Sequence, residues 1–190
     1  MKKSALLLTG ILVLMLTACV KMPGVQSEVL DIGPDMEGKE GVNIEFDAFS
    51  SEVMEGINDP EPYSFVTRVS IEGTGTTKDG YQITAAVGTY SPVEKEDIDA
   101  FSAVLMKSMG TTAGSELKEY EMPARGSFGN FCEQNDIRIE FYADEDLDTE
   151  NAQPYFVYEH KAGEPIALDP DQSAYEADYY KRKDILERSL

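Results

Sequence analysis

The stretch Tyr63-Ser-Phe-Val-Thr-Arg-Val-Ser-Ile-Glu72 and the stretch Tyr81-Gln-Ile-Thr-Ala-Ala-Val87 decide the expected fold. In each, apolar and polar side chains alternate, and a period of two residues indicates a strand with one buried face. The Gly- and Thr-rich link between them predicts a hairpin. Because a one-residue slip would send one apolar set to the wrong face, parity favours a three-residue turn at 78–80, with Ile71 opposite Val87 and Val69 opposite Thr89.

Directly after the hairpin, Ser91-Pro92-Val93-Glu94 predicts the start of a helix. A serine that can cap the helix, a proline at the first helical position and a glutamate three residues after the cap all favour this start. Gly110 is expected to end the helix, which therefore spans about 92–109. Apolar residues recur at helical spacing and are expected to pack on the sheet. They are Ile98, Phe101, Val104, Leu105 and Met109.

Shorter patterns complete the expected domain. Asp169-Pro170-Asp171-Gln172 is a second helix start, which predicts a C-terminal helix over about 170–188. A helical turn is expected at 51–56, and further strands are expected at 42–46, 116–122, 131–132, 137–141, 155–160 and 165–168. The strands at 137–141 and 155–160 are expected to form a second hairpin. Together these elements predict one α+β domain over 42–190, with a mostly antiparallel sheet and both helices packed on it.

The N-terminal residues have a different character. Lys2 and Lys3 precede a run at 5–16 that is almost wholly apolar, which is typical of an export signal. The run is shorter than the ~20 apolar residues that a membrane-spanning helix needs, so removal of the segment is favoured over a permanent anchor. The alternatives are an ordinary secretory signal and a spanning helix.

Leu16-Thr17-Ala18-Cys19 resembles the lipobox of bacterial lipoproteins, and the resemblance covers only the signal. It implies that 1–18 is a signal peptide and that Cys19 becomes the N-terminus and carries a thioether-linked diacylglycerol. The chain would then be anchored by lipid outside the cytoplasmic membrane, or on the outer membrane of an organism that has one. Two acyl chains are enough for stable anchoring. Residues 19–41, which contain repeated Gly and Pro, are expected to be the lipidated N-terminus and a flexible tether.

The acidic balance of the chain excludes some partners. Loss of Lys2 and Lys3 with the signal leaves 14 basic residues against 36 acidic ones, a formal charge of −22. Such a field repels nucleic acid and anionic lipid headgroups, and it attracts cations and basic protein surfaces. The lipid on Cys19 is therefore expected to be the only membrane contact, with a surface or envelope protein as a further partner.

Cys132 and His160 are the first candidate for chemistry in the domain. Cys132 is the only cysteine besides Cys19, and His160 is the only histidine. A cysteine and a histidine can act together as a nucleophile and its base. No motif surrounds either residue. A small buried cysteine is therefore the simpler interpretation.

Asp144, Asp146 and Asp148 are weak candidates for a metal site, because they have the spacing with which calcium loops begin. Thr149 stands where such a loop needs glycine, and Tyr155 stands where it needs a bidentate glutamate. A solvated hairpin loop is therefore favoured over weak cation binding.

The segment 181–183 holds the only concentrated positive charge in the domain. It is expected to be a solvated helix face that forms salt bridges with Asp178, Asp184 and Glu187. The alternative is a docking patch for an acidic partner.

The sequence contains no nucleophile elbow, zinc-ligand cluster or phosphate loop, and no cofactor is expected. With 36 acidic residues, a pair of catalytic carboxylates could always be imagined, so composition cannot support one. We therefore expect a non-catalytic binding or accessory domain of unspecified ligand, anchored outside the membrane by lipid. The alternatives are an extracytoplasmic hydrolase that uses carboxylates and a cation- or solute-binding component of a transporter.

Overall fold

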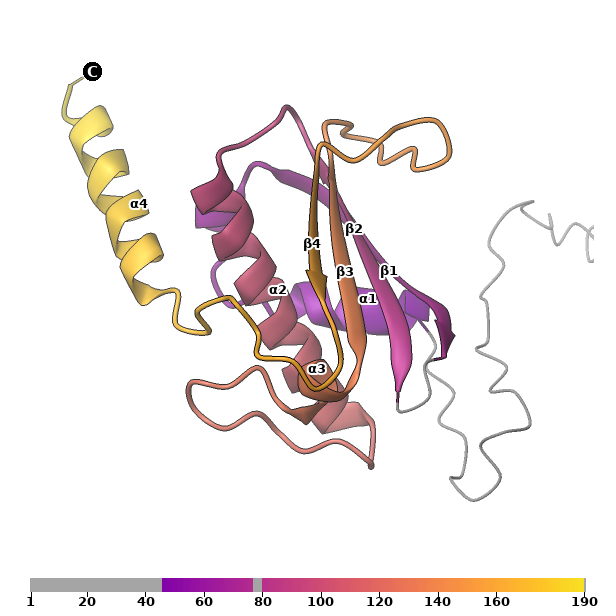
Figure 1. The fold of residues 1–190 in the computed structure, drawn as a ribbon. Coiled ribbons are helices and arrows are strands. Elements are labelled where there is room, and N and C mark those ends of the chain that lie inside the picture. The colour runs from indigo at the N-terminus through magenta and orange to yellow at the C-terminus, as the bar shows by residue number, and fades with distance from the viewer. Residues whose placement is uncertain (1–45, 77–79, 190) are drawn as a thin grey trace, which may run out of the picture.

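The computed structural model describes residues 46–76 and 80–189 (Figure 1). Its strands are β1 (Val66–Thr76), β2 (Tyr81–Thr89), β3 (Asp136–Tyr142) and β4 (Phe156–His160), which form one sheet in the order β1-β2-β3-β4. Its helices are α1 (Phe46–Glu55), the short 3₁₀ helix η2 (Glu61–Tyr63), α2 (Lys95–Glu116), α3 (Asn130–Gln134) and α4 (Ser173–Glu187). The predicted α+β class is confirmed. The predicted signal peptide, Cys19 and the tether lie outside the described residues.

The hairpin of β1 and β2 forms as predicted, but its register differs by two residues. The observed pairs include Val69↔Val87, Ile71↔Ala85 and Thr76↔Tyr81. The turn is therefore one residue longer than predicted, and an irregularity between Gly73 and Gly75 shifts the pairing by one more residue. A shift of two residues preserves parity, so the apolar side chains still share one face. Alternation thus predicted both strands and their buried faces but not the register.

The centre of the sheet is parallel. β2 and β3 run in the same direction, because the chain between them crosses over through α2 and α3. β3 and β4 form the predicted second hairpin, so two of the three strand pairs are antiparallel. The pairs Ile83↔Ile137, Ala85↔Ile139 and Val87↔Phe141 are buried on one face.

Several of the shorter predicted strands are wrong. Phe46 does not end a strand but begins α1, and Phe131 and Cys132 lie in α3. The segments 117–122 and 165–168 contain no strand, because α2 continues to residue 116 and the later segment is irregular. Phe46, Phe49 and Val53 share one face of a helix by spacing and are all buried, which explains α1. A short apolar run fits either a strand or a buried segment of helix, so its sequence does not distinguish the two.

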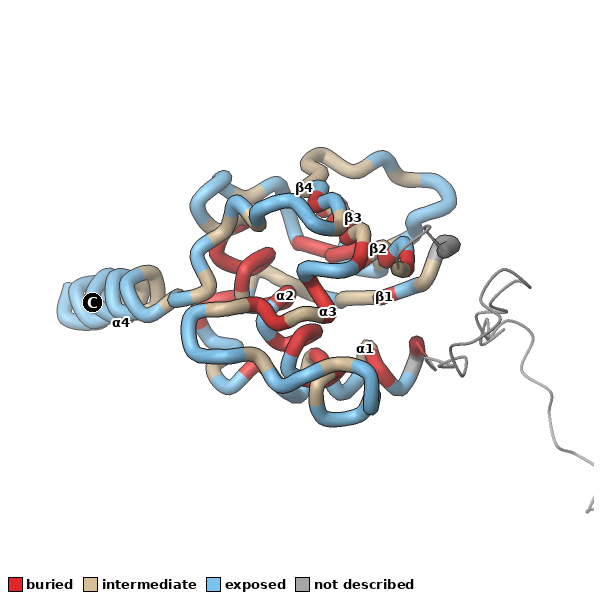
Figure 2. The backbone as a smooth tube through the Cα atoms, turned by 60° about the horizontal axis from the view of Figure 1, so that its bottom comes forward, coloured by how far each residue is buried: buried red, intermediate tan, exposed pale blue. Residues whose placement is uncertain are grey.

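The core lies between the sheet and α1, α2 and α3, which cover one face (Figure 2). Phe101, Leu105 and Met109 of α2 and Phe131 of α3 are almost completely buried there. α1 also protects the edge strand β1. The Ser50 hydroxyl accepts the N–H of Ile71 at 3.0 Å and lies 3.3 Å from its carbonyl, to which it donates. The middle of this edge is therefore not available for pairing.

The central helix differs from its prediction at both ends. Glu94 is the N-cap in place of Ser91, with no side-chain cap, and the helix begins at Lys95. It runs through Gly110 to Glu116. Burial of Met109 and Ala113 on either side of Gly110 offsets the ~1 kcal/mol that glycine costs inside a helix. Gly110 is itself buried, and a Cβ there would lie 1.9 Å from the Phe128 carbonyl oxygen.

The C-terminal helix does not lie on the sheet as predicted. α4 begins at Ser173, has no buried residue and projects from the rest of the domain (Figure 2). Its first turns contact η2, where the rings of Tyr63 and Tyr175 stack with centroids 5.7 Å apart. The apolar residues of α4 are too few and too scattered to bury a continuous face, and most of its surface stays in water.

Candidate functional site

The predicted lipid-attachment residue, Cys19, lies outside the described residues. Across 46–76 and 80–189, no helix combines the length and apolar character needed to cross a bilayer. The lipobox thus stays a prediction from the sequence, and the described domain offers other candidate sites.

The carboxylates of the 143–155 loop bind the backbone of the loop itself. Asp144 accepts the N–H of Asp146 at 3.0 Å and the N–H of Asp148 at 3.1 Å. Asp148 in turn accepts a hydrogen bond from the Asn151 side chain at 2.8 Å. In the part of the chain that the structure describes, no group of three or more His, Cys, Asp or Glu side chains could hold a metal ion. Asp144 therefore caps the backbone of the loop, and Asp148 joins it to Asn151.

Cys132 and His160 are brought together, but not as a nucleophile and base. Both are buried, and the Cys132 thiol donates to the Met106 carbonyl oxygen at 3.1 Å. The His160 side chain hydrogen-bonds the Cys132 backbone rather than its sulfur. Burial raises the pKa of the Cys132 thiol, which disfavours the reactive thiolate. The simpler interpretation, a small buried residue, fits this geometry.

His160 gives the domain a pH dependence. Its Nε2 atom is buried and has no hydrogen-bond partner among the described residues. Burial lowers the pKa of His160 below 6.5, although the Cys132 backbone and the nearby Glu164, Asp136 and Glu133 act in the opposite direction. The unfolded chain therefore binds this proton more readily than the folded domain. The associated stability is present above the unfolded pKa and is lost as the pH falls below about 6.5.

We expect the free energy of unfolding to fall more steeply between pH 7 and pH 5 in the wild type than in His160→Asn. A single proton that binds only to the unfolded chain changes the free energy of unfolding by at most about 1.4 kcal/mol per pH unit. Asparagine keeps a short hydrogen-bond donor for the Cys132 backbone but does not titrate. Urea unfolding at several pH values measures both slopes. Equal slopes would show that His160 does not carry the effect.

A small recess of about 140 Å³ lies on the sheet near His160. The charged side chains around it are paired with one another. Lys161 binds Asp136 at 3.1 Å, and Arg138 forms ion pairs with Glu140 and Glu159. These pairs leave no unmatched charge to orient a ligand, so the recess is a weaker candidate than the groove described next.

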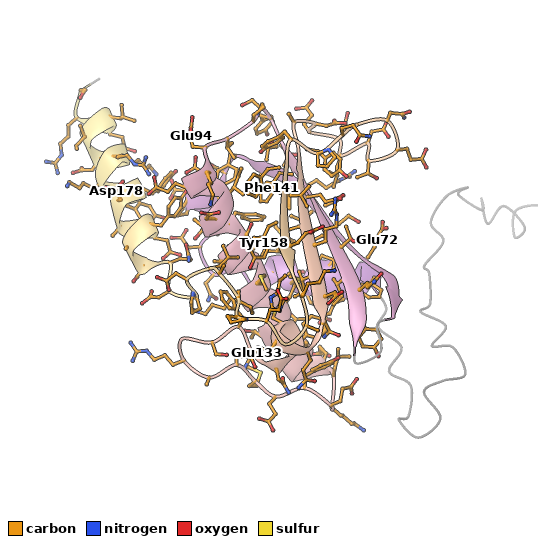
Figure 3. All side chains as sticks on the ribbon, in the orientation of Figure 1. Glu72, Glu94, Glu133, Phe141, Tyr158 and Asp178 are labelled. Carbon is orange, nitrogen blue, oxygen red and sulfur yellow. The ribbon has the colours of Figure 1, made fainter. Side chains whose placement is uncertain are left out.

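A larger groove of about 560 Å³ lies between the first turns of α2 and the first turns of α4. The link at 167–172, which leads into α4, closes one side. The apolar part of its lining is Ala100, Ala167, Leu168, Ala174 and Tyr175. Its carboxylates are Glu96, Asp99, Asp169, Asp171 and Asp178. Figure 3 labels Asp178 on α4 and Glu94 beside the N-terminal end of α2. We call this feature the acidic groove.

The acidic groove carries a net negative charge. Among the described residues, Lys95 is the only basic one in its lining, and it is paired with Asp99 at 2.5 Å. Asp171 accepts the N–H of Ser173 at 3.1 Å, and hydrogen bonds from the Ser173 side chain and backbone lower the pKa of the Asp171 carboxyl. Its charge therefore persists at neutral pH. The positive ends of two helices favour these carboxylates, which is why acidic residues gather at both starts.

The first turns of α4 are attached to the domain through aromatic and charged contacts. The Tyr175 hydroxyl donates to Asp97 at 2.8 Å, and the Tyr180 hydroxyl donates to Asp59 at 2.8 Å. Lys183 forms an ion pair with Glu61. These contacts fix one wall of the acidic groove.

The basic segment 181–183 is partly paired as predicted. Arg182 binds Asp178 at 3.1 Å, but Lys183 binds Glu61 rather than Glu187, and Asp184 binds Arg188 at 2.7 Å. The acidic groove was not predicted from the sequence, although both helix starts were recognised. The missing information was that the two starts lie side by side. Comparison with protein-family models, with curated proteins and with solved structures gives no match to this chain.

Proposed function

We propose that the chain is a lipid-anchored extracytoplasmic binding domain and that its acidic groove takes a basic segment with an apolar side. The observation that carries this proposal is the combination of an apolar floor with five surrounding carboxylates, of which Asp99 is paired with Lys95 and Asp178 with Arg182. An apolar side chain would bury the floor, and lysine or arginine residues beside it would face the carboxylates. Charge complementarity of this kind mainly supplies specificity and a fast association rate.

A binding role agrees better than hydrolysis with the charges in the domain. A carboxyl that acts as general acid near neutral pH needs a raised pKa. Among the described residues, each carboxyl with a shifted pKa is shifted downward by hydrogen bonds or nearby cations. These groups are Glu61, Asp136, Glu140 and Asp171. They are suited to remain charged and to bind cations.

The proposed anchor gives the acidic groove a location. A diacylglycerol on Cys19 would hold the domain at the membrane, and residues 20–41 as a flexible coil would reach about 25 Å. Anionic headgroups would repel a chain of formal charge −22, so the domain would stay clear of the bilayer. Its partners would be basic segments of proteins at the same surface.

The proposal predicts that a basic amphipathic peptide binds the mature lipoprotein in uncharged detergent. The probe is a fluorescein-labelled helical peptide of 12 residues, in which pairs of lysines alternate with pairs of leucines. Fluorescence anisotropy measures its binding. Glu96→Gln combined with Asp178→Asn removes two groove charges and should weaken binding about five- to tenfold, since each exposed pair contributes ~0.2–1 kcal/mol. Binding should also weaken as salt is raised.

A matched control removes the same charge elsewhere. Glu145 and Glu150 are exposed in the 143–155 loop, so Glu145→Gln combined with Glu150→Gln leaves the acidic groove intact. This variant should bind the peptide within about twofold of the wild type. If both double variants lose affinity equally, the peptide senses only the overall charge and the groove is not its site.

A further inference from the structure

The distal half of α4 is held to the described domain by Lys183, which pairs with Glu61, but its apolar side chains are uncovered. Ile185 is 55% exposed and Leu186 is 66% exposed, and no residue of the helix is buried. A helix of 15 residues is only marginally stable in water without packing of one face. The contacts of α4 with the domain are made by Tyr175, Glu176, Tyr180 and Lys183, which leaves the side of the helix that carries Ala174, Asp178 and Ile185 exposed.

The groove-lining face of α4 continues along its length. Ala174 and Asp178 line the acidic groove, and residues three to four positions apart share a helix face. The same face therefore carries Lys181 and Ile185, whereas Leu186 lies about 100° further around the helix. Its first half is small and acidic, whereas its second half is basic and ends in a large apolar side chain.

Such a face is complementary to itself when two copies run antiparallel. Ala174 then lies opposite Ile185 of the other helix, and Asp178 lies opposite Lys181. In this arrangement a small side chain packs against a large one, and a carboxylate faces an ammonium group. The same two contacts occur twice about a two-fold axis, as in an isologous dimer. The intrachain pair of Arg182 with Asp178 is exposed and contributes little to stability. Its loss would therefore not oppose the pairing of Asp178 with Lys181 of the second copy.

We propose that the occupant of the acidic groove is α4 of a second copy of this chain, bound antiparallel about a two-fold axis near Tyr180. This inference rests on the proposed function, because it identifies one basic, apolar segment that the groove would take. Ile185 of the second copy reaches the apolar floor, and its basic residues face the carboxylates at the rim. Pairing covers the exposed face of both helices.

Membrane anchoring assists this association. Two domains on tethers of about 25 Å share a thin layer above the bilayer, which raises their effective concentration. The formal charge of each chain opposes association in general, so only a locally complementary surface would overcome it. The pairing is therefore expected to be specific to α4 and sensitive to single changes there.

The test is the protein mass of the mature lipoprotein in an excess of uncharged detergent micelles, measured by light scattering with the detergent contribution subtracted. The wild type is expected to have twice the mass of one chain at about 100 µM. Ile185→Asp is expected to have the mass of one chain. Leu186→Asp is the matched control, because Leu186 is more exposed but lies on another face of the helix. It should remain dimeric.

A charge exchange tests the pairing itself. Asp178→Lys should give single chains, and Asp178→Lys combined with Lys181→Asp should restore the doubled mass, since both interchain contacts are then inverted together. Ile185 is exposed, so Ile185→Asp should leave the fold of each chain intact, which an unchanged far-ultraviolet circular dichroism spectrum verifies. A wild type of single-chain mass, or equal effects of Ile185→Asp and Leu186→Asp, overturns the proposal.

The peptide titration separates this inference from the proposed function. If the dimer blocks the acidic groove, Ile185→Asp should bind the basic peptide at least fivefold more tightly than the wild type. A wild type that is a single chain and still binds the peptide would reject the dimer and retain the groove. A dimer whose Ile185→Asp variant does not bind the peptide would reject the groove as a general site for basic segments.

Discussion

Replacement of Gly110 by alanine is expected to lower the free energy of unfolding by about 2–4 kcal/mol. Within a helix, alanine is normally favoured over glycine by ~1 kcal/mol. The expected loss of stability therefore comes from packing and not from helix propensity. A Cβ at Gly110 would lie 1.9 Å from the Phe128 carbonyl oxygen, a backbone atom that cannot rotate away. The segment before α3 would have to move, and Phe128, which is buried, would lose its contacts.

The same segment also packs closely on Gly114, where a Cβ would lie 2.8 Å from the backbone of Met122. α2 thus carries two glycines one turn apart, over which the 117–129 segment folds back. Urea unfolding followed by circular dichroism measures the change. Thr111→Ala is the control, because Thr111 is exposed in the same turn and should change stability by less than about 0.5 kcal/mol. A Gly110→Ala variant as stable as the wild type would contradict the observed packing.

Replacement of Cys19 by alanine is expected to abolish lipid attachment completely. A thioether requires the cysteine sulfur, and the mature domain has a charge that anionic membranes repel. Loss of two acyl chains removes ~0.8 kcal/mol for each buried CH₂, which is far more than any surface contact could replace. Labelling of growing cells with radioactive fatty acid should therefore mark the wild type and leave Cys19→Ala unlabelled.

Cys132→Ala is the matched control for this experiment. Cys132 is the only other cysteine in the chain and is buried, so its replacement should leave the label unchanged. Fractionation complements the label, because the labelled protein should stay with membranes after a high-salt wash. A Cys19→Ala variant that still incorporates fatty acid and stays membrane-bound would refute the resemblance to a lipobox.

Much of the fold could be predicted because it depends on strict periodicity. The alternation at 66–72, 81–87 and 137–141 identified three strands and their buried faces. The central helix was recognised from its start signal and apolar stripe. The register of the first hairpin could not be predicted, since parity is preserved by any shift of two residues. The end of α2 could not be predicted either, because Gly110 is required by a distant backbone contact rather than by a cap.

The candidate site was less predictable than the fold. Acidic residues at 96–99 and at 169–171 were visible as favourable helix starts, but only the tertiary structure places them around one groove. α4 was expected on the sheet as part of an α+β domain. In the structure, Tyr175 stacks on Tyr63 at the edge of the domain instead. A helix without a continuous apolar stripe has no sequence pattern that indicates which element it packs against.

Amide hydrogen exchange of the mature lipoprotein, with and without the basic peptide, tests the acidic groove most directly. We expect slower exchange in the first turns of α4 and in the link at 167–172, with no change in β1 on the far edge of the sheet. The Glu96→Gln and Asp178→Asn double variant should lose most of this protection at the same peptide concentration. Protection located elsewhere in the domain, or unchanged in the double variant, would contradict the proposal that the groove binds basic segments.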